Sequence, residues 1–267
     1  MKKISLRFTA LLTLGVLGSI GFCGCSTVPI TGRQQLNLIS AGQEMQLGLS
    51  SFENMKKEVP ISRDAAANAL VQRIGRRIAN VAVNDLPGAQ WEFIVFESKE
   101  ANAFCLPGGK IGVYTGILPI TKDEAGLATV LGHEVAHAAA HHGAERMSEA
   151  LVTDLGGQIL GLSLAKSDPK MQAAMSAIYG LGSQLGVALP HSRQNESEAD
   201  EMGLIYMARA GFNPAAAVAL WERFASATGS NGGGLWFLRT HPVTGDRIQH
   251  IKSILPRAEV EFKNAPR

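Results

Sequence analysis

Apolar residues recur every three or four positions over two long stretches near the start of the chain, and this spacing predicts amphipathic helices. The first stretch runs from about residue 41 to 58. The second runs from about 63 to 83, where Leu70, Ile74 and Ile78 share one face. The turn sequence N-D-L-P-G ends the second stretch. We expect both helices to wrap around a core that the following segments form.

The pattern then changes to short runs of β-branched and aromatic residues, which predict strands. Residues 91–96 (W-E-F-I-V-F) form one strand, and residues 102–106 and 110–115 form a hairpin across the turn P-G-G. Helical spacing returns later in the chain, at 121–142, 192–203, 215–227 and beyond 242. This order predicts an α+β fold that is predominantly α-helical, with a small sheet immediately before the helix that starts at Thr121.

The helix expected from Thr121 carries H-E-V-A-H at 133–137, a sequence that can supply both a zinc site and its catalytic base. On a helix, His133 and His137 lie one turn apart on one face, so both imidazoles can bind one Zn²⁺. Glu134 can lie beside the open position of the metal and take a proton from bound water. The alternative is that both histidines are ordinary helix residues, capped by neighbours or solvent.

A catalytic zinc ion needs a third protein ligand, and two candidates compete. His141 continues the histidine stripe, but at a rise of 1.5 Å per residue it lies about 12 Å from His133, too far to share an ion. Glu196, on the helix expected at 192–203, is the better candidate, because Asp200 one turn on can accept the free ring N–H of a ligating histidine. The alternative is that the acids of this helix form a solvated face.

The two motifs together resemble the zinc metallopeptidase family that includes the CAAX prenyl protease, HtpX and BepA, in which H-E-x-x-H is followed by E-x-x-A-D. Residues 196–200 (E-S-E-A-D) match the second motif, and the resemblance covers most of the chain. It implies a zincin-like metallopeptidase core in a soluble periplasmic lipoprotein. It also implies one Zn²⁺ per chain, held by His133, His137 and Glu196, with Glu134 as the base.

The resemblance also concerns a strand and a segment near the C-terminus. A histidine in a T/S-H-P segment of that family either stabilises the oxyanion or occupies the fourth zinc position and silences the enzyme, and His241 matches it. Arg247 matches the arginine that follows, which positions substrate or stabilises this loop. Asn102 and Ala103 resemble the strand that holds substrate backbone over the metal through main-chain hydrogen bonds. A surface-turn cap at His241 and an interior strand at Asn102 are the alternatives.

The N-terminal sequence is typical of a secretory signal, with three basic residues before an apolar run from 8 to 22. The following F-C-G-C-S resembles a bacterial lipobox in which Cys25 is acylated, and Ser26 after it favours the outer membrane where the host has two membranes. An uncleaved anchor helix is the alternative. We therefore expect a signal peptide over 1–24, a tether that joins the fold over 25–40, and one zinc metallopeptidase domain over 41–267.

Composition narrows the possible partners. The chain is 46% hydrophobic and 18% charged, which suits one sizeable globular core. Without the basic residues of the signal, 22 basic residues remain against 23 acidic ones, so no basic surface indicates nucleic acid.

In the acylated form Cys105 is the one remaining free thiol, and we expect it to be buried. The stretch from 150 to 192 forms either core helices or a mobile lid.

The sequence therefore predicts a zinc metalloendopeptidase, anchored by lipid to a membrane in the periplasm. Its expected partners are protein or peptide substrates, chiefly misfolded or unassembled envelope proteins. Two alternatives stay open. One is an outer-membrane protein assembly and quality-control factor that binds unfolded clients, with proteolysis silenced or secondary. The other is a zinc hydrolase of non-peptide amides.

Overall fold

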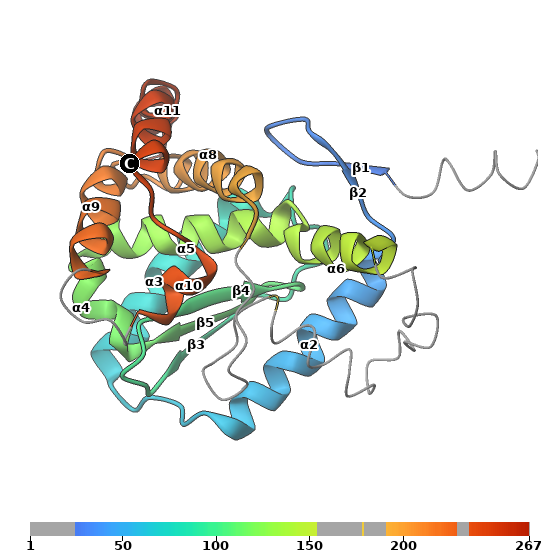
Figure 1. Ribbon diagram of the computed structural model, residues 1–267. Helices are drawn as coiled ribbons and strands as arrows, with labels where there is room; N and C mark the ends of the chain where they lie inside the picture. Colours follow the sequence, from blue (N-terminus) through green and yellow to red (C-terminus); the bar gives the residue numbers. More distant parts are fainter. Residues whose placement is uncertain (1–24, 154–177, 179–190, 229–234, 267) are drawn as a thin grey trace, which may run out of the picture.

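The computed structural model describes residues 25–153, 178, 191–228 and 235–266, and a small β-sheet lies between helices on its two faces (Figure 1). Its strands, in spatial order, are β3 (Glu92–Phe96), β5 (Lys110–Tyr114) and β4 (Ala103–Leu106). β3 is parallel to β5, and β4 is antiparallel to it across a turn. In this turn Gly108 and Gly109 have φ of +85° and +78°, which glycine adopts without strain. The three predicted strands are confirmed to within one residue.

Helices make up most of the remaining described chain, as predicted. In chain order they are α2 (Ala41–Glu58), α3 (Ala65–Ala82), the 3₁₀ turn η1 (Thr115–Ile117), α4 (Leu118–Thr121), α5 (Glu124–Ala139), α6 (His142–Thr153), α8 (Arg193–Arg209), α9 (Ala216–Thr228), α10 (Trp236–Thr240) and α11 (Gly245–Asn264). None of these helices is long and apolar enough to cross a membrane. The predicted signal peptide and most of the stretch from 150 to 192 lie outside the described residues.

Side chains alternate between the two faces of the sheet, and each face packs against different helices. Ile111 and Val113 of β5 belong to the core shared with α3 and α5. Phe104 of β4 lies on the other face with Phe52 of α2, and their ring centroids are 6.3 Å apart. Cys105 is buried, as predicted, and burial raises the pKa of its thiol well above the usual range. The sheet thus holds α5 in the interior of the protein.

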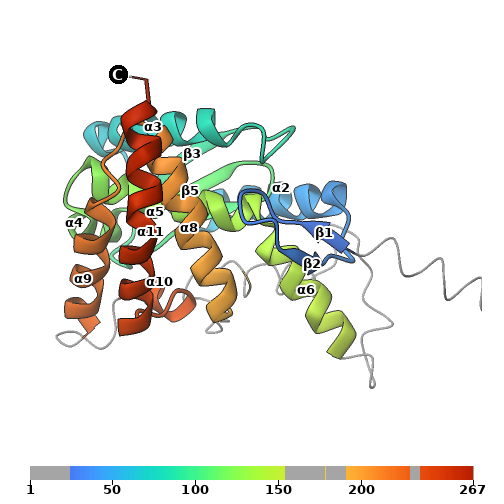
Figure 2. The same ribbon diagram turned by 90° about the horizontal axis from the view of Figure 1, so that it is seen from above.

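Two glycines allow α5 and α8 to cross at close range. A Cβ on Gly132 would lie 2.7 Å from the carbonyl oxygen of Gly203, and a Cβ on Gly203 would lie 2.8 Å from the backbone nitrogen of His133. Real Cβ atoms do not approach other atoms so closely, so this crossing requires glycine at both positions. α11 lies along the outer side of α8 (Figure 2). The crossing sets the distance between the two helices that carry the metal-binding motifs.

The first described residues form a β-hairpin. β1 (Cys25–Thr27) pairs antiparallel with β2 (Gln34–Leu36), and the hairpin lies beside α6 at one end of the molecule (Figure 2). Gln35 donates a hydrogen bond of 2.8 Å to the carbonyl of Ala140, at the C-terminal end of α5. The segment that we expected to be a tether joining the fold therefore packs against the helices that follow. The division of the chain after residues 24 and 40 stays a prediction.

The start signal predicted at Thr121 is wrong. Thr121 ends α4, and Asp123 caps α5 by accepting a hydrogen bond of 2.8 Å from the backbone N–H of Gly126. Lys122 between them has a φ of +68°, which separates the two helices. Aspartate and threonine both make good caps, so the sequence alone does not distinguish these two starts. The same helix ends before His141, whose φ of +53° separates α5 from α6.

Candidate metal centre

Helix α5 carries two histidines into the interior. His133 and His137 lie one turn apart on the helix, and each is 2% exposed. Their Nε2 atoms face each other at 3.1 Å. The two rings therefore converge as two ligands of one ion would.

Helix α8 brings a carboxylate to the same point. Ser192 caps this helix by accepting a hydrogen bond of 3.1 Å from the backbone N–H of Asn195, which places Glu196 in the first turn. Glu196 Oε1 lies 3.2 Å from His137 Nε2, and its Oε2 lies 3.6 Å from His133 Nε2. Because Glu196 is 5% exposed, it does not belong to a solvated acidic face.

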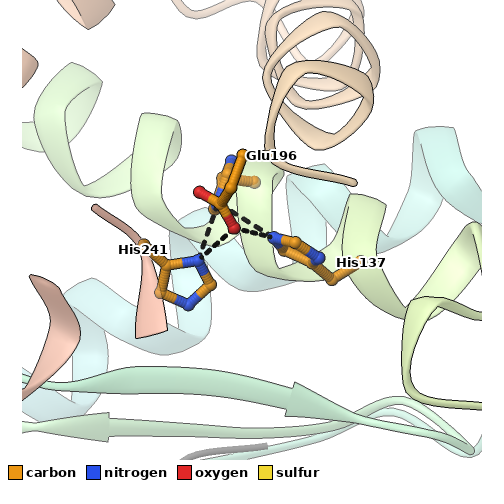
Figure 3. Close-up of side chains that lie close together, drawn as sticks. His137, Glu196 and His241 are labelled. Carbon is orange, nitrogen blue, oxygen red and sulfur yellow. Dashed lines mark hydrogen bonds and ion pairs between the residues drawn. The ribbon is translucent and has the colours of Figure 1, made fainter. Parts of the chain in front are cut away.

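A third histidine joins the cluster from the segment after α10. The backbone N–H of His241 donates to the carbonyl of Phe237 at 2.9 Å. His241 Nδ1 lies 2.9 Å from Glu196 Oε1 and 3.2 Å from His133 Nε2. Figure 3 shows the rings of His137 and His241 converging on the Glu196 carboxylate. At 4% exposed, His241 does not cap a surface turn.

These four side chains fit a zinc ion in both geometry and chemistry. One ligand atom from each lies within 4.8 Å of the others, and the separations given above run from 2.9 to 3.6 Å. Tetrahedral zinc with bonds of about 2.0–2.1 Å holds its ligand atoms about 3.3–3.4 Å apart. Two facing imidazole nitrogens can share only one proton, so a cation at the centre stabilises this arrangement.

Burial and nearby charges set the protonation of the cluster. Burial lowers the pKa of His137 well below its usual range, so its ring is neutral and able to bind a cation. Burial acts in the same direction on His133, but hydrogen bonds to Asp200 and Glu196 outweigh it and raise the pKa of His133 to about 9. Zinc therefore has to displace a proton there. Burial would raise the pKa of Glu196, yet the charge of Arg247 holds it well below the usual range.

Glu134 lies beside the cluster. Its Oε1 accepts no hydrogen bond from the described residues and lies 3.4 Å from His241 Nε2. Burial raises the pKa of the Glu134 carboxyl above its ordinary value. This shift brings the pKa closer to neutral pH, where a carboxylate exchanges protons most effectively during catalysis. The position and the shifted pKa both suit a general base.

Asp200 and Arg247 form a buried support behind His133. The Nδ1 atom of His133 lies 3.1 Å from Asp200 Oδ1, and Arg247 donates to both oxygens of Asp200 at 2.7 and 2.8 Å. The Arg247 guanidinium also lies 2.5 Å from Glu196 Oε2 and 3.6 Å from the centre of the Trp221 ring. These contacts orient the His133 ring with Nε2 towards the cluster. A direct contact of Arg247 with substrate stays a prediction.

The strand expected to hold substrate lies next to the metal helix. β4 packs against α5 and is an edge strand among the described strands. Asn102 and Ala103 are each 2% exposed, and the backbone N–H of Phe237 donates to the carbonyl of Ala101 at 2.9 Å. A peptide can pair with this strand only when its edge becomes accessible. The role of Asn102 and Ala103 in substrate binding therefore stays a prediction.

His141 does not reach the cluster, in agreement with the distance argument from the sequence. Its Nδ1 lies 2.6 Å from Glu44 Oε2 on α2. The hydrogen bond to the Glu44 carboxylate raises the pKa of His141 above its ordinary value. The pair joins α2 to the break between α5 and α6.

Sequence patterns did not indicate three residues around the cluster. His142 Nδ1 lies 2.9 Å from His137 Nδ1, and His142 Nε2 lies 3.0 Å from Glu198 Oε2. The ring centroid of His191 is 4.1 Å from that of His137. The sequence held a signal for Glu198, which lies inside the E-x-x-A-D segment. Helical spacing does not single out His142 or His191.

A cavity of about 480 Å³ opens beside the cluster. Glu196, Pro242 and Arg247 are among the residues that line it. A cavity of this size is typical of binding sites for small ligands or side chains. Glu196 is the member of the cluster that lines this cavity.

Comparison with known proteins identifies the family. The description "Peptidase family M48" fits residues 65–255, a range that includes both motifs and all four side chains of the cluster. The mitochondrial metalloendopeptidase OMA1 of Schizosaccharomyces pombe is 36% identical over 263 residues, which are 97% of this chain and 74% of that protein. OMA1 of Saccharomyces cerevisiae is 31% identical, with 99% of this chain and 79% of that protein covered. The beta-barrel assembly-enhancing protease of Escherichia coli is 28% identical, over 94% of this chain and 52% of that protein. The predicted family, fold class and peptidase activity are thereby confirmed, and the chain belongs to peptidase family M48 as a zinc metalloendopeptidase.

Proposed function

We propose that His133, His137 and Glu196 hold one zinc ion and that Glu134 is the general base for hydrolysis of a peptide bond. The observation that carries the proposal is the convergence of these ligand atoms at one buried point, with Glu134 Oε1 beside it. Zinc held there would polarise the peptide carbonyl and lower the pKa of a water molecule to about 7.

The residues of the chain perform the proton transfers and hold the geometry. Glu134 takes a proton from the attacking water and delivers it to the leaving amine, so it returns to its starting state as the peptide bond breaks. Asp200 accepts the Nδ1–H of His133 and keeps the lone pair of Nε2 on the metal side. Arg247 balances the negative charge of Asp200 and Glu196 in this buried site.

Glu134→Gln tests the assigned base. The variant keeps the size of the side chain but accepts no proton. We therefore expect it to retain one zinc ion per chain and to cleave unfolded casein at a rate lower by about 10²-fold or more. Zinc content is measured by elemental analysis and cleavage by release of fluorescent peptides. Glu124→Gln, at the exposed start of the same helix, is the matched control and should keep both properties. Wild-type cleavage by Glu134→Gln would refute the assignment.

His241 lies at the fourth corner of the cluster, where a catalytic zinc ion needs to bind water. We propose that His241 holds this corner in a silent form and leaves it when substrate binds. The alternative is a histidine that donates a hydrogen bond to the oxyanion. His241→Ala separates the two, because peptidase activity rises when a blocking ring is removed. It falls by about 10²-fold when an oxyanion donor is removed.

We further propose that the enzyme is anchored in the periplasm by acylation of Cys25 and cleaves misfolded or unassembled envelope proteins. The lipobox-like sequence and the similarity to the beta-barrel assembly-enhancing protease of Escherichia coli support this proposal. Cells grown with an alkyne-labelled fatty acid should label the wild-type chain and not Cys25→Ser, which should also leave the membrane fraction. Equal labelling of both chains, or a cytoplasmic wild type, would contradict the proposal.

A second candidate function is client binding during assembly of outer-membrane proteins, with proteolysis silenced. The name of the Escherichia coli relative and the position of His241 at the fourth corner favour it. Under this hypothesis Glu134→Gln still binds an unfolded β-barrel protein and still supports its assembly in cells. Loss of assembly together with loss of cleavage would favour the protease instead.

A further inference from the structure

A chain of hydrogen bonds links His137 to the N-terminal hairpin. His137 Nδ1, the ring nitrogen that does not face His133, lies 2.9 Å from His142 Nδ1. His142 Nε2 lies 3.0 Å from Glu198 Oε2, and Arg33 Nε donates to the same oxygen at 2.8 Å. The chain thus crosses α5, α6 and α8 and ends in the loop between β1 and β2. The proton transfers proposed for catalysis do not involve His142, Glu198 or Arg33.

The atoms of this chain fit one arrangement of protons. A histidine that binds a metal through Nε2 carries its hydrogen on Nδ1, so His137 donates from Nδ1. His142 accepts this hydrogen bond at its own Nδ1 and therefore carries its hydrogen on Nε2. From Nε2 it donates to the carboxylate of Glu198. Each group fixes the tautomer and the orientation of the one before it.

Arg33 closes the chain from the hairpin. It donates to both oxygens of Glu145 on α6, at 2.5 and 2.8 Å, and it bonds Glu198 on α8. Thr31 donates a second hydrogen bond from the same loop to Glu198. Glu145 in turn accepts a hydrogen bond of 2.8 Å from Asn195, the residue before the ligating carboxylate. One guanidinium therefore pairs with two carboxylates that are 5% and 6% exposed, and it joins the two helices.

We propose that His142 is a positioning residue for His137 and that Arg33 of the hairpin holds His142 in place through Glu198. The inference rests on the proposed function, because it takes His137 as a zinc ligand. Behind His133 a single carboxylate, Asp200, performs this task. Behind His137 the imidazole of His142 lies between the ligand and the carboxylate of Glu198. Glu198 is in turn held by Arg33 of the N-terminal hairpin. The hairpin therefore contributes to zinc affinity without contacting the metal.

Zinc dissociation constants of the full chain, measured by competition with a chelator, test this inference. His142→Phe is expected to weaken zinc binding by about 10- to 100-fold, as loss of the partner behind a ligating histidine does. His142→Asn keeps an acceptor near the position of Nδ1, whereas His142→Gln keeps a group only near that of Nε2. We therefore expect His142→Asn to bind zinc more tightly than His142→Gln. Arg33→Leu is expected to weaken binding several-fold.

Arg209→Leu is the matched control for Arg33→Leu, because Arg209 is also an arginine paired with a glutamate, and it lies on α8, the helix that carries Glu198, without contact with the chain of hydrogen bonds. Its bonds to Glu261, at 2.9 and 3.0 Å, lie on the side that faces α11. We expect zinc affinity to be unchanged in this variant, and an equal loss there would overturn the inference.

Thermal unfolding in the presence of EDTA shows which variants fold. Where His142→Phe does not fold, the comparison of His142→Asn with His142→Gln and the effect of Arg33→Leu decide the outcome. Equal zinc affinity of the wild type and these three variants would overturn the inference. A wild-type chain that binds no zinc would overturn the proposed function instead, so the two failures are distinguishable.

Discussion

Gly203→Ala tests whether the close approach of α5 and α8 sets the geometry of the metal centre. The new Cβ would lie 2.8 Å from the backbone nitrogen of His133 and 2.9 Å from its Cα. Ordinary van der Waals contacts begin at 3.4 Å, so the two helices have to separate by roughly half an ångström at this point. The displaced backbone belongs to a proposed zinc ligand, so the ligand moves with it.

Two opposing effects set the size of the response. Overpacking against a rigid backbone costs about 1–3 kcal/mol, whereas the better helix propensity of alanine returns about 1 kcal/mol. We therefore expect the free energy of unfolding to fall by about 1 kcal/mol. Zinc ligands tolerate displacements of only about 0.2 Å, so zinc affinity is expected to fall by about tenfold or more.

Urea unfolding of the metal-free chain and chelator competition measure the two effects separately. Gly42→Ala is the matched control, because Gly42 lies in helix α2 and a Cβ there meets nothing within 4 Å. It should leave zinc affinity unchanged and raise stability by up to about 1 kcal/mol. Wild-type stability and zinc affinity in Gly203→Ala would refute the claim that this crossing sets the site.

Three further predictions concern the surroundings of the cluster. Glu44 raises the pKa of His141 above its ordinary 6.5, so the pair stabilises the fold fully below that pH and loses its effect as pH rises through the raised pKa. Glu44→Gln should cost about 1–2 kcal/mol in urea unfolding at pH 5.5, and this cost should fall as the pH rises through the raised pKa of His141; a pH-independent cost would contradict the pairing. Asp200→Asn should weaken zinc binding by about 10- to 100-fold in chelator competition, because it removes the carboxylate behind His133; an unchanged affinity would exclude this support. Removal of zinc should lower the melting temperature of both the wild type and Glu134→Gln, since zinc at a hundred times its Kd adds about 2.7 kcal/mol. Identical melting curves with zinc and with EDTA would contradict a site formed only in the folded state.

Local patterns predicted those parts of the site that lie within one helix. The spacing of His133 and His137 places them on one face, because the helical repeat brings residues four apart together. The same argument placed Glu196 and Asp200 on one face of α8. Both helices begin at side-chain caps, Asp123 and Ser192, and the predicted starts lie within three residues of the observed ones. Both have alanine as the C-cap residue, and the predicted end of α8 at residue 203 falls six residues before the observed end at Arg209.

Contacts between distant segments could not be predicted in this way. Arg33 and Glu198 are 165 positions apart, and no local pattern indicates that they meet. The contribution of His142 depends on the break at His141, whose φ of +53° interrupts the helix and brings the next ring to His137. A continuous helix, which the sequence indicated for this stretch, would have placed His142 on a different face.

The central claim is that one zinc ion is held by two histidines of α5 and a glutamate of α8. A crystal structure of the zinc-loaded chain, with anomalous scattering recorded on both sides of the zinc absorption edge, tests it directly. We expect one anomalous peak, about 2.0–2.2 Å from His133 Nε2, His137 Nε2 and a carboxylate oxygen of Glu196. A zinc ion bound elsewhere, or one bound here without Glu196, would contradict the account.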